Sequence, residues 1–255
     1  MSAPALETRG VTVRFGHFTA NAEVDLAIAP GSRHAIIGPN GAGKTTFVHA
    51  LTGGLAPAAG KVLLGGTDVT RWREARRVRQ GLARTYQINQ LFRSLTVLDN
   101  VALPIFEREG KTSSFWSSAR GDRKVRDEAM AHLGFVNLTG VADRTVASLP
   151  YGQQRMLEIA IALATRPNVL VLDEPAAGVP AAASEAIFER IEALPSSLTL
   201  LFIEHDMNLV FRFAQRITVL VGGRVMAEGT PAEISADERV RAIYLGRRGH
   251  HAARD

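Results

Sequence analysis

Hydrophobic and polar positions change their period along this chain of 255 residues. Residues 6–15 and 22–28 alternate between apolar and polar side chains, which predicts strands of a half-buried sheet. Further strands, several of them apolar runs typical of buried strands, are predicted at residues 33–37, 61–69, 82–87, 169–172, 198–203, 216–221 and 224–228. From about residue 91 to residue 166, apolar positions recur mostly at helical spacing. The pattern therefore predicts an α/β core with an inserted helical subdomain.

Several helix starts carry local signals. A helical pattern begins after Lys44, and Thr96 with Asp99 is a candidate helix cap. Residues 230–233 and 235–238 each match a capping box. Other helices are predicted at residues 122–134, 181–194 and 206–214. The expected organisation is a single domain over residues 1–246, with a core from 1–88 and 165–236, a helical subdomain over 89–164, a C-terminal helix over 237–246 and a disordered tail at 247–255.

Composition narrows the class of protein. The chain lacks cysteine, which excludes disulfides and thiolate chemistry and suits a reducing cytoplasm. It shows neither a signal peptide nor a run of about 18 apolar residues that would span a bilayer. The net charge is +5, with basic clusters at residues 71–79 and 120–126. Solvated helix faces explain these clusters better than a surface for anionic lipid or nucleic acid.

Residues 38–45 read Gly-Pro-Asn-Gly-Ala-Gly-Lys-Thr and fit the phosphate-binding pattern G-x-x-x-x-G-K-[ST] between a predicted strand and a predicted helix. Glycines let successive N–H groups point at phosphate oxygens, and the helix start adds its positive end. Lys44 would contact the β- and γ-phosphates, Thr45 would bind Mg²⁺, and Thr46 would contact the α-phosphate. The candidate ligands of ATP are Gly38, Pro39, Asn40, Gly41, Ala42, Gly43, Lys44, Thr45 and Thr46.

Two buried strands end in candidate catalytic residues. Asp173 and Glu174 lie at the carboxyl end of the run that begins at residue 169, where ligands bind in open α/β sheets. Asp173 would hold Mg²⁺, and Glu174 would activate the attacking water as a general base. His205 follows the strand at 198–203, where its neutral ring would contact the γ-phosphate and the water. Hydrolysis of ATP with Mg²⁺ is the predicted chemistry.

Residues 149–155, Leu-Pro-Tyr-Gly-Gln-Gln-Arg, resemble the signature motif of the ATP-binding subunits of ABC transporters. The resemblance implies an α/β P-loop NTPase (RecA-like) core with an antiparallel β subdomain and an inserted α-helical signature subdomain. It implies that Gln87 contacts Mg²⁺, that His205 is the switch histidine, and that Phe15 stacks on adenine, although a core position explains Phe15 equally well. The nucleotide of a second protomer would then meet Pro150, Tyr151, Gly152 and Gln153.

The resemblance is strongest to the branched-chain amino acid importer ATPases. It rests on residues 90–97, 149–155, 173–178, 203–207 and 244–246. That branch implies transmembrane permease subunits, a second ATPase subunit that is identical or different, and a periplasmic solute-binding protein. It also implies a peripheral position on the cytoplasmic face of the membrane and no nucleic acid partner. The expected solutes are branched-chain amino acids or related small polar or carboxylate compounds.

Two departures from the family pattern concern nucleotide contacts between protomers. Pro150 replaces the usual serine of the signature and removes a hydroxyl. After Gly178 the chain continues with Val179 and Pro180, where the branch has a polar residue before proline. Three other functions remain as alternatives: a lipopolysaccharide-type exporter ATPase, an ABC ATPase acting on DNA or ribosomes, and a structural subunit without activity. The signature and the long helical insert argue against the exporter ATPase. The lack of a heptad run argues against an ABC ATPase acting on DNA or ribosomes, and the presence of Lys44 and Glu174 argues against an inactive subunit.

Overall fold

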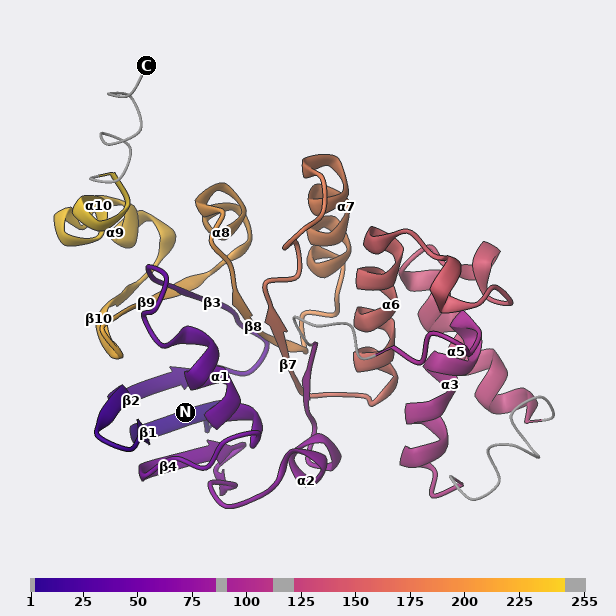
Figure 1. Ribbon diagram of the computed structural model, residues 1–255, viewed down its shortest axis with the longest axis horizontal. Coiled ribbons are helices and arrows are strands. Elements are labelled where there is room, and N and C mark those ends of the chain that lie inside the picture. The colour runs from indigo at the N-terminus through magenta and orange to yellow at the C-terminus, as the bar shows by residue number, and fades with distance from the viewer. Residues whose placement is uncertain (1–2, 86–90, 112–121, 246–255) are drawn as a thin grey trace. The chain divides into compact units, whose positions relative to one another are not determined.

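The computed structural model describes residues 3–85, 91–111 and 122–245. The chain divides into two compact units, which are named here by their place in the sequence (Figure 1). The terminal unit combines Met1–Glu74 with Ser196–Asp255, and the middle unit is Ala75–Pro195. In the part of the chain described, no helix is long and apolar enough to cross a bilayer.

The first sheet of the terminal unit is antiparallel, as the resemblance implies, with strand order β2-β1-β4-β5. The hairpin of β1 (Leu6–Phe15) and β2 (Phe18–Ile28) turns at Gly16, whose φ of 59° favours glycine. On its other edge β1 pairs with β4 (Ala59–Leu64), which in turn pairs with β5 (Thr67–Asp68). The strand predicted at 61–69 is therefore two short strands, because a Gly-Gly turn divides it.

The second sheet of the terminal unit has the strand order β10-β9-β3-β8. The central strand β3 (Arg33–Ile37) runs parallel to β8 (Thr199–Ile203) and to β9 (Arg216–Val221), while β10 (Arg224–Gly229) is antiparallel to β9. Burial on both faces explains why the second half of β3 and most of β8 are apolar. The loop that follows β3 therefore leaves the middle of the sheet at a carboxyl end, where ligands bind in such sheets.

Helices of the terminal unit begin close to the predicted positions. They are α1 (Lys44–Thr52), α8 (Met207–Phe213), α9 (Pro231–Ala236) and α10 (Glu238–Leu245). The predicted capping box at α9 is confirmed, because the Thr230 side chain accepts from the Glu233 N–H and the Glu233 carboxylate accepts from the Thr230 N–H. The second predicted box is wrong. The carboxylate of Asp237 caps α10, whereas the Ser235 hydroxyl donates back to the Ala232 carbonyl within α9.

The middle unit pairs two parallel strands, β6 (Leu82–Arg84) and β7 (Val169–Asp173), with a group of helices. The helices are α3 (Val97–Arg108), α5 (Arg123–Phe135), α6 (Tyr151–Ala164) and α7 (Ala181–Glu192), with short 3₁₀ turns at 139–141 and 146–148. Helices α3, α5 and α6 pack against one another (Figure 1). The predicted cap of α3 is confirmed, because the Thr96 hydroxyl accepts from the Asp99 N–H.

The first basic cluster includes a short helix, α2 (Glu74–Arg79), that apolar spacing does not predict. Most of its arginines are accessible to solvent, but Arg77 is 1% exposed. The interpretation of the whole cluster as a solvated face is therefore wrong for Arg77. Burial of a guanidinium depends on tertiary packing, which a run of charged letters does not reveal.

His34 is a buried histidine in the strand that leads to the phosphate-binding loop. It is 1% exposed, and its Nε2 lies 2.7 Å from Thr218 Oγ1 on β9. Burial, helped by the positive charge of Arg216, lowers the pKa of His34 from 6.5 to about 4. The folded state thus binds fewer protons than the unfolded state between these two pKa values. Its stabilising contribution is complete above the unfolded pKa and is lost as the pH falls toward the folded one.

We expect acidification from neutral pH to about pH 4 to remove about 3 kcal/mol of unfolding free energy through His34, at about 1.4 kcal/mol per pKa unit. A His34→Gln variant lacks the titrating ring, so its stability should change less over this interval. Urea unfolding of both proteins at several pH values measures the difference. Parallel pH dependences in the two proteins would contradict the assignment.

Candidate nucleotide-binding site

Glycines shape the loop of residues 38–43, which joins β3 to α1. Gly41 and Gly43 have φ angles of 80° and 91°, in the left-handed region that favours glycine. A Cβ atom at Gly43 would lie 2.5 Å from the Ala20 carbonyl oxygen and 2.7 Å from Asn21 Nδ2, too close for any other residue. The loop can therefore direct backbone N–H groups toward an anion, which fits a bound phosphate.

Lys44 opens α1, and its ammonium group closes over the loop. Its Nζ donates to the carbonyl oxygens of Gly38 at 2.8 Å and Pro39 at 3.0 Å. No side chain caps the first amides of α1 in this described segment. Thr45 is exposed and Thr46 is half-buried at the same helix end. A cation beside uncapped helix amides and two hydroxyls is a donor set that fits a polyphosphate and its metal ion.

Tyr244 is a contact of the loop that the sequence reasoning did not identify as a site residue. It lies on α10, and its hydroxyl lies near the Gly38 backbone N–H. Burial raises the pKa of Tyr244 to about 12, and this N–H opposes the rise. The phenol therefore stays neutral, and α10 supports the start of the loop. No local signal reveals this contact, because it joins residues far apart in the sequence.

His205 follows β8 and exposes 69% of its side chain, while the neighbouring Glu204 is buried. The Glu204 carboxylate accepts from the His205 backbone N–H at 3.2 Å and lies 3.7 Å from His205 Nδ1. The ring also borders a cavity of about 460 Å³ between α8 and the C-terminal helices α9 and α10. His205 is accessible at a strand end, as its predicted contact with phosphate and water requires.

Asp173 ends β7 inside the middle unit with no exposed side-chain surface. Its Oδ2 accepts from Arg84 Nη2 at 2.6 Å, and the Arg84 side chain is only 4% exposed. Among the described residues, Oδ1 of Asp173 has no hydrogen-bond partner. A buried carboxylate oxygen without a donor fits a metal ion or its water, because oxygen ligands suit Mg²⁺. The residues present therefore fit the predicted metal.

Arg84 is the functional residue of this region that sequence reasoning missed. Parallel pairing places Arg84 opposite Val171, two residues before Asp173. A charged residue ending an otherwise apolar strand was the available signal, but its partner follows only from strand register. The next residue, Thr85, continues the pairing by donating its N–H to the Val171 carbonyl at 2.9 Å.

Glu174 begins the loop after β7 with a φ of 48°. A residue other than glycine in the left-handed region is strained and depends on its surroundings to stay there. The loop continues through turns, in which the Ala177 N–H donates to the Glu174 carbonyl at 3.0 Å and the Val179 N–H donates to the Ala176 carbonyl at 3.3 Å. The backbone thus places the predicted base directly beside the predicted metal ligand.

The signature residues form the start of α6. Pro150 is the N-cap and provides no side-chain cap, so the first amides of α6 are available to an anion. Gly152 and Gln153 are half-buried in the first turn, and Tyr151 is 41% exposed. Gln153 Oε1 is buried and has no hydrogen-bond partner in the described residues.

Two predicted contacts have different outcomes. Phe15 is 52% exposed beside the hairpin turn, so its interpretation as a core residue is wrong, whereas stacking on adenine stays a prediction. Gln87 lies outside the described residues. Within each unit the structure brings several site residues to one region: the glycine loop with Lys44 in the terminal unit, and Asp173 with Glu174 in the middle unit.

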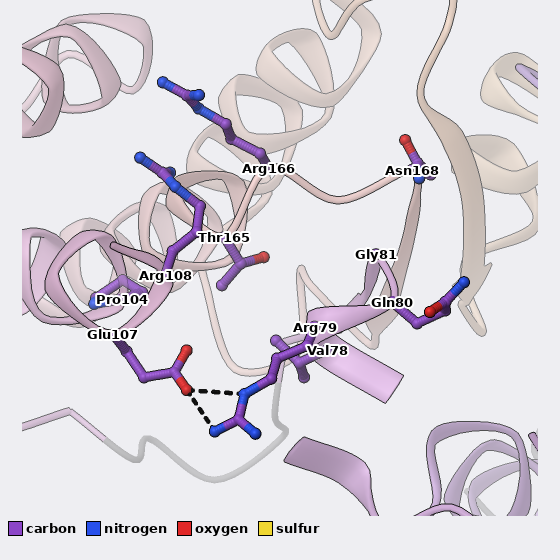
Figure 2. Close-up of a pocket in the computed structure, with 10 residues that line it drawn as sticks. All are labelled: Val78, Arg79, Gln80, Gly81, Pro104, Glu107, Arg108, Thr165, Arg166 and Asn168. Carbon is purple, nitrogen blue, oxygen red and sulfur yellow. Dashed lines mark hydrogen bonds and ion pairs between the residues drawn. The ribbon is translucent and has the colours of Figure 1, made fainter. Parts of the chain in front are cut away.

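A second feature of the middle unit is a groove of about 410 Å³. It is lined by the end of α2, the end of α3 and the loop before β7, with Val78, Arg79, Gln80, Gly81, Pro104, Glu107, Arg108, Thr165, Arg166 and Asn168. Figure 2 shows Arg79 and Glu107 turned toward each other, at 2.8 Å, while Arg108 and Arg166 point away from that pair. The lining is mostly polar and charged, unlike an enclosed apolar ligand pocket.

Comparison with known proteins gives consistent results. The ABC transporter family profile matches residues 22–177, and a profile described as branched-chain amino acid ATP-binding cassette transporter matches residues 224–250. The chain is 38% identical to the high-affinity branched-chain amino acid transport ATP-binding protein BraF of Pseudomonas aeruginosa, over 96% of this chain and 99% of BraF. It has the same identity and coverage with the corresponding protein LivG of Escherichia coli K12.

The fold has a matching solved structure. A crystal structure of the ADP conformation of MJ1267, an ATP-binding cassette of an ABC transporter, superimposes with a TM-score of 0.83. The two chains are 31% identical, and the match covers 96% of this chain and 100% of the other. The predicted α/β fold class is therefore confirmed.

The buried pair of Arg84 and Asp173 leads to a stability prediction. Arg84→Met leaves a buried carboxylate without its cation, so we expect a loss of about 3–5 kcal/mol of unfolding free energy. Adding Asp173→Asn should recover part of that loss, because the remaining group is neutral. Arg79→Met is the matched control, since its ion pair with Glu107 is largely exposed and should contribute less than about 1 kcal/mol. Equal losses from Arg84→Met and Arg79→Met in urea unfolding would refute the assignment.

Proposed function

We propose, because this chain belongs to the ABC transporter family of ATP-binding subunits, that it powers an importer of branched-chain amino acids or related small polar or carboxylate solutes. The observation that carries the proposal is the identity to BraF and LivG over nearly the full length of both chains. The match at residues 224–250 to the profile of that branch supports it further. As a member of this family the chain is an ATPase, and the direction of transport and the solute are the proposed part.

The glycine loop would bind the triphosphate of ATP. Its backbone amides and the N-terminal amides of α1 would donate to the phosphate oxygens. Lys44 would exchange its carbonyl acceptors, Gly38 and Pro39, for the β- and γ-phosphates, which are stronger acceptors because they are charged. The exposed Phe15 would stack on the adenine ring.

Thr45 and Asp173 would hold Mg²⁺, with Gln87 as a further proposed contact. When bound, this ion neutralises charge that develops on the phosphates during transfer. Arg84 would keep one oxygen of Asp173 occupied and leave Oδ1 toward the ion or its water. Glu174 would accept the proton of the attacking water, and His205 would orient that water and donate to the γ-phosphate.

The uncapped start of α6 would complete the site of a second ATPase subunit. Its amides at Tyr151 and Gly152 would donate to the γ-phosphate of ATP held by the partner, and Gln153 would contribute its side chain. Each ATP would then bridge two subunits, which makes association depend on nucleotide. The partner is a second copy of this chain or a sister subunit.

The permease subunits are the proposed membrane partners, and the groove of the middle unit is a suitable docking position for one of their cytoplasmic segments. Gly81 lines this groove and directly precedes β6. The other end of β6 carries Arg84, which binds Asp173, and the chain then continues to Gln87. A segment bound in the groove would therefore act on β6, whose Arg84 binds the proposed metal ligand Asp173. The subunit would sit peripherally on the cytoplasmic face of the membrane, next to permeases fed by a solute-binding protein.

Substitution of the base tests the hydrolytic mechanism. Glu174→Gln should lower kcat by about 10²–10⁴-fold, the usual contribution of a general base, while ATP still binds. With ATP bound and little turnover, the variant should form a dimer, alone or with a sister subunit, in light scattering. Lys44→Ala is the comparison, because it removes charge at the phosphates and should weaken ATP binding itself in calorimetry. Full turnover by Glu174→Gln would remove Glu174 from the mechanism.

Direction and solute are tested by transport. Proteoliposomes that contain the permease subunits and this chain should accumulate labelled leucine when ATP is on the side of the chain and the binding protein is on the other. The Glu174→Gln chain should not support accumulation. Efflux of a lipid-linked substrate without leucine uptake would instead favour the exporter function.

A further inference from the structure

Tyr151 is held along the signature helix by a residue one turn further on. Arg155 Nη2 donates to the Tyr151 hydroxyl at 2.6 Å, and its guanidinium carbon lies 5.1 Å from the centre of the ring. Residues four apart lie on the same face of a helix, so the two side chains meet on one face of α6. The Tyr151 hydroxyl is therefore held by a residue of its own helix.

A buried ion pair fixes Arg155 in turn. Arg155 Nη1 donates to Glu158 Oε2 at 2.8 Å, and the two side chains are 3% and 8% exposed. Burial raises the pKa of Glu158, while the bond from Arg155 opposes this rise. Separating two buried partners leaves an uncompensated charge, so the pair resists movement. The Tyr151 hydroxyl is thus bound to an arginine that is itself fixed within α6.

The other side of the Tyr151 ring contacts the loop of residues 174–179, named here the Glu174 loop. Gly178 has a φ of 77°, and a Cβ atom there would lie 3.4 Å from Tyr151 Cε1 and 3.6 Å from its hydroxyl. The Gly178 backbone therefore packs against the ring. The loop and the signature helix therefore meet at this aromatic side chain.

The Glu174 loop needs such external support. Glu174 itself has a strained φ of 48°, and the two turn hydrogen bonds at Ala177 and Val179 are 3.0 and 3.3 Å long. A strained backbone persists only when its surroundings determine it. The Tyr151 ring packs against this loop at Gly178, so the ring is one of the surroundings that hold the loop in place within the middle unit.

We propose that Tyr151 is a positioning residue that couples the signature helix to the Glu174 loop of the same chain. The proposal rests on the proposed function, in which the start of α6 binds the partner's ATP and Glu174 serves the ATP of its own chain. A shift of α6 when the partner's ATP binds would move the ring, and the ring would move the loop that carries the base. One side chain would thus connect the two nucleotide sites of the dimer.

The test compares Tyr151→Ala, which removes the ring, with Tyr151→Phe, which keeps the ring and loses only the bond from Arg155. In the assembled transporter we expect Tyr151→Ala to lower kcat about tenfold or more, because small misplacements of a base are costly, with little change in KM for ATP. Hydrogen exchange of the full chain without nucleotide should be faster at residues 174–179 in Tyr151→Ala, since the loop loses its support. Tyr151→Phe should restore most of both properties.

Each outcome decides the proposal. If Tyr151→Ala lowers kcat but leaves hydrogen exchange at residues 174–179 unchanged, Tyr151 acts elsewhere and the proposal is wrong. An unchanged kcat in Tyr151→Ala would also overturn the proposal. If Tyr151→Ala unfolds, full activity and native hydrogen exchange in Tyr151→Phe still support the ring contact. If Tyr151→Phe loses both its activity and its native exchange, the proposal is refuted. Glu174→Gln separates this proposal from the proposed function. Turnover that survives Glu174→Gln contradicts the function, while the exchange measurement without nucleotide tests the contact independently.

Discussion

The ion pair between Arg84 and Asp173, buried between two parallel strands, is the interaction on which the middle unit depends. The four residues before Asp173 in β7 are at most 1% exposed, so water cannot stabilise its charge. Arg84 supplies the compensating charge from β6, and parallel pairing of the two strands sets the distance. The pair satisfies one oxygen and leaves the other for a ligand. A shift of one residue in register would turn Arg84 to the opposite face and would leave Asp173 without its cation.

Local patterns in the sequence predict much of this structure. The glycine loop, the strand before it and the helix after it follow from spacing alone, because the positive φ angles of Gly41 and Gly43 and the period of apolar residues are local properties. Asp173, Glu174 and His205 could be chosen because they end apolar strands. Their partners could not be chosen in this way. Arg84 acts through a contact set by strand register and Tyr244 through tertiary packing, and such contacts leave no periodic signal.

The wrong expectations have the same physical origin. The letters at residues 235–238 match a capping box, yet the Asp237 carboxylate accepts from the Arg239 N–H, and the Ser235 hydroxyl donates back into α9. Arg77 belongs to a charged run, but tertiary packing buries it. Phe15 is apolar in an alternating strand, but its place beside the hairpin turn exposes it. Burial is a property of the folded neighbourhood rather than of the residue type.

The order of strands has a consequence for the time at which the protein matures during synthesis. The strand that carries the glycine loop, β3, lies between β8 and β9, which the ribosome adds more than 150 residues later. Contacts so distant in sequence form slowly because a long chain segment must close first. A nascent chain therefore carries the glycine loop long before both neighbours of β3 have been synthesised, and the loop gains its final frame only after β8 and β9 pair with that strand.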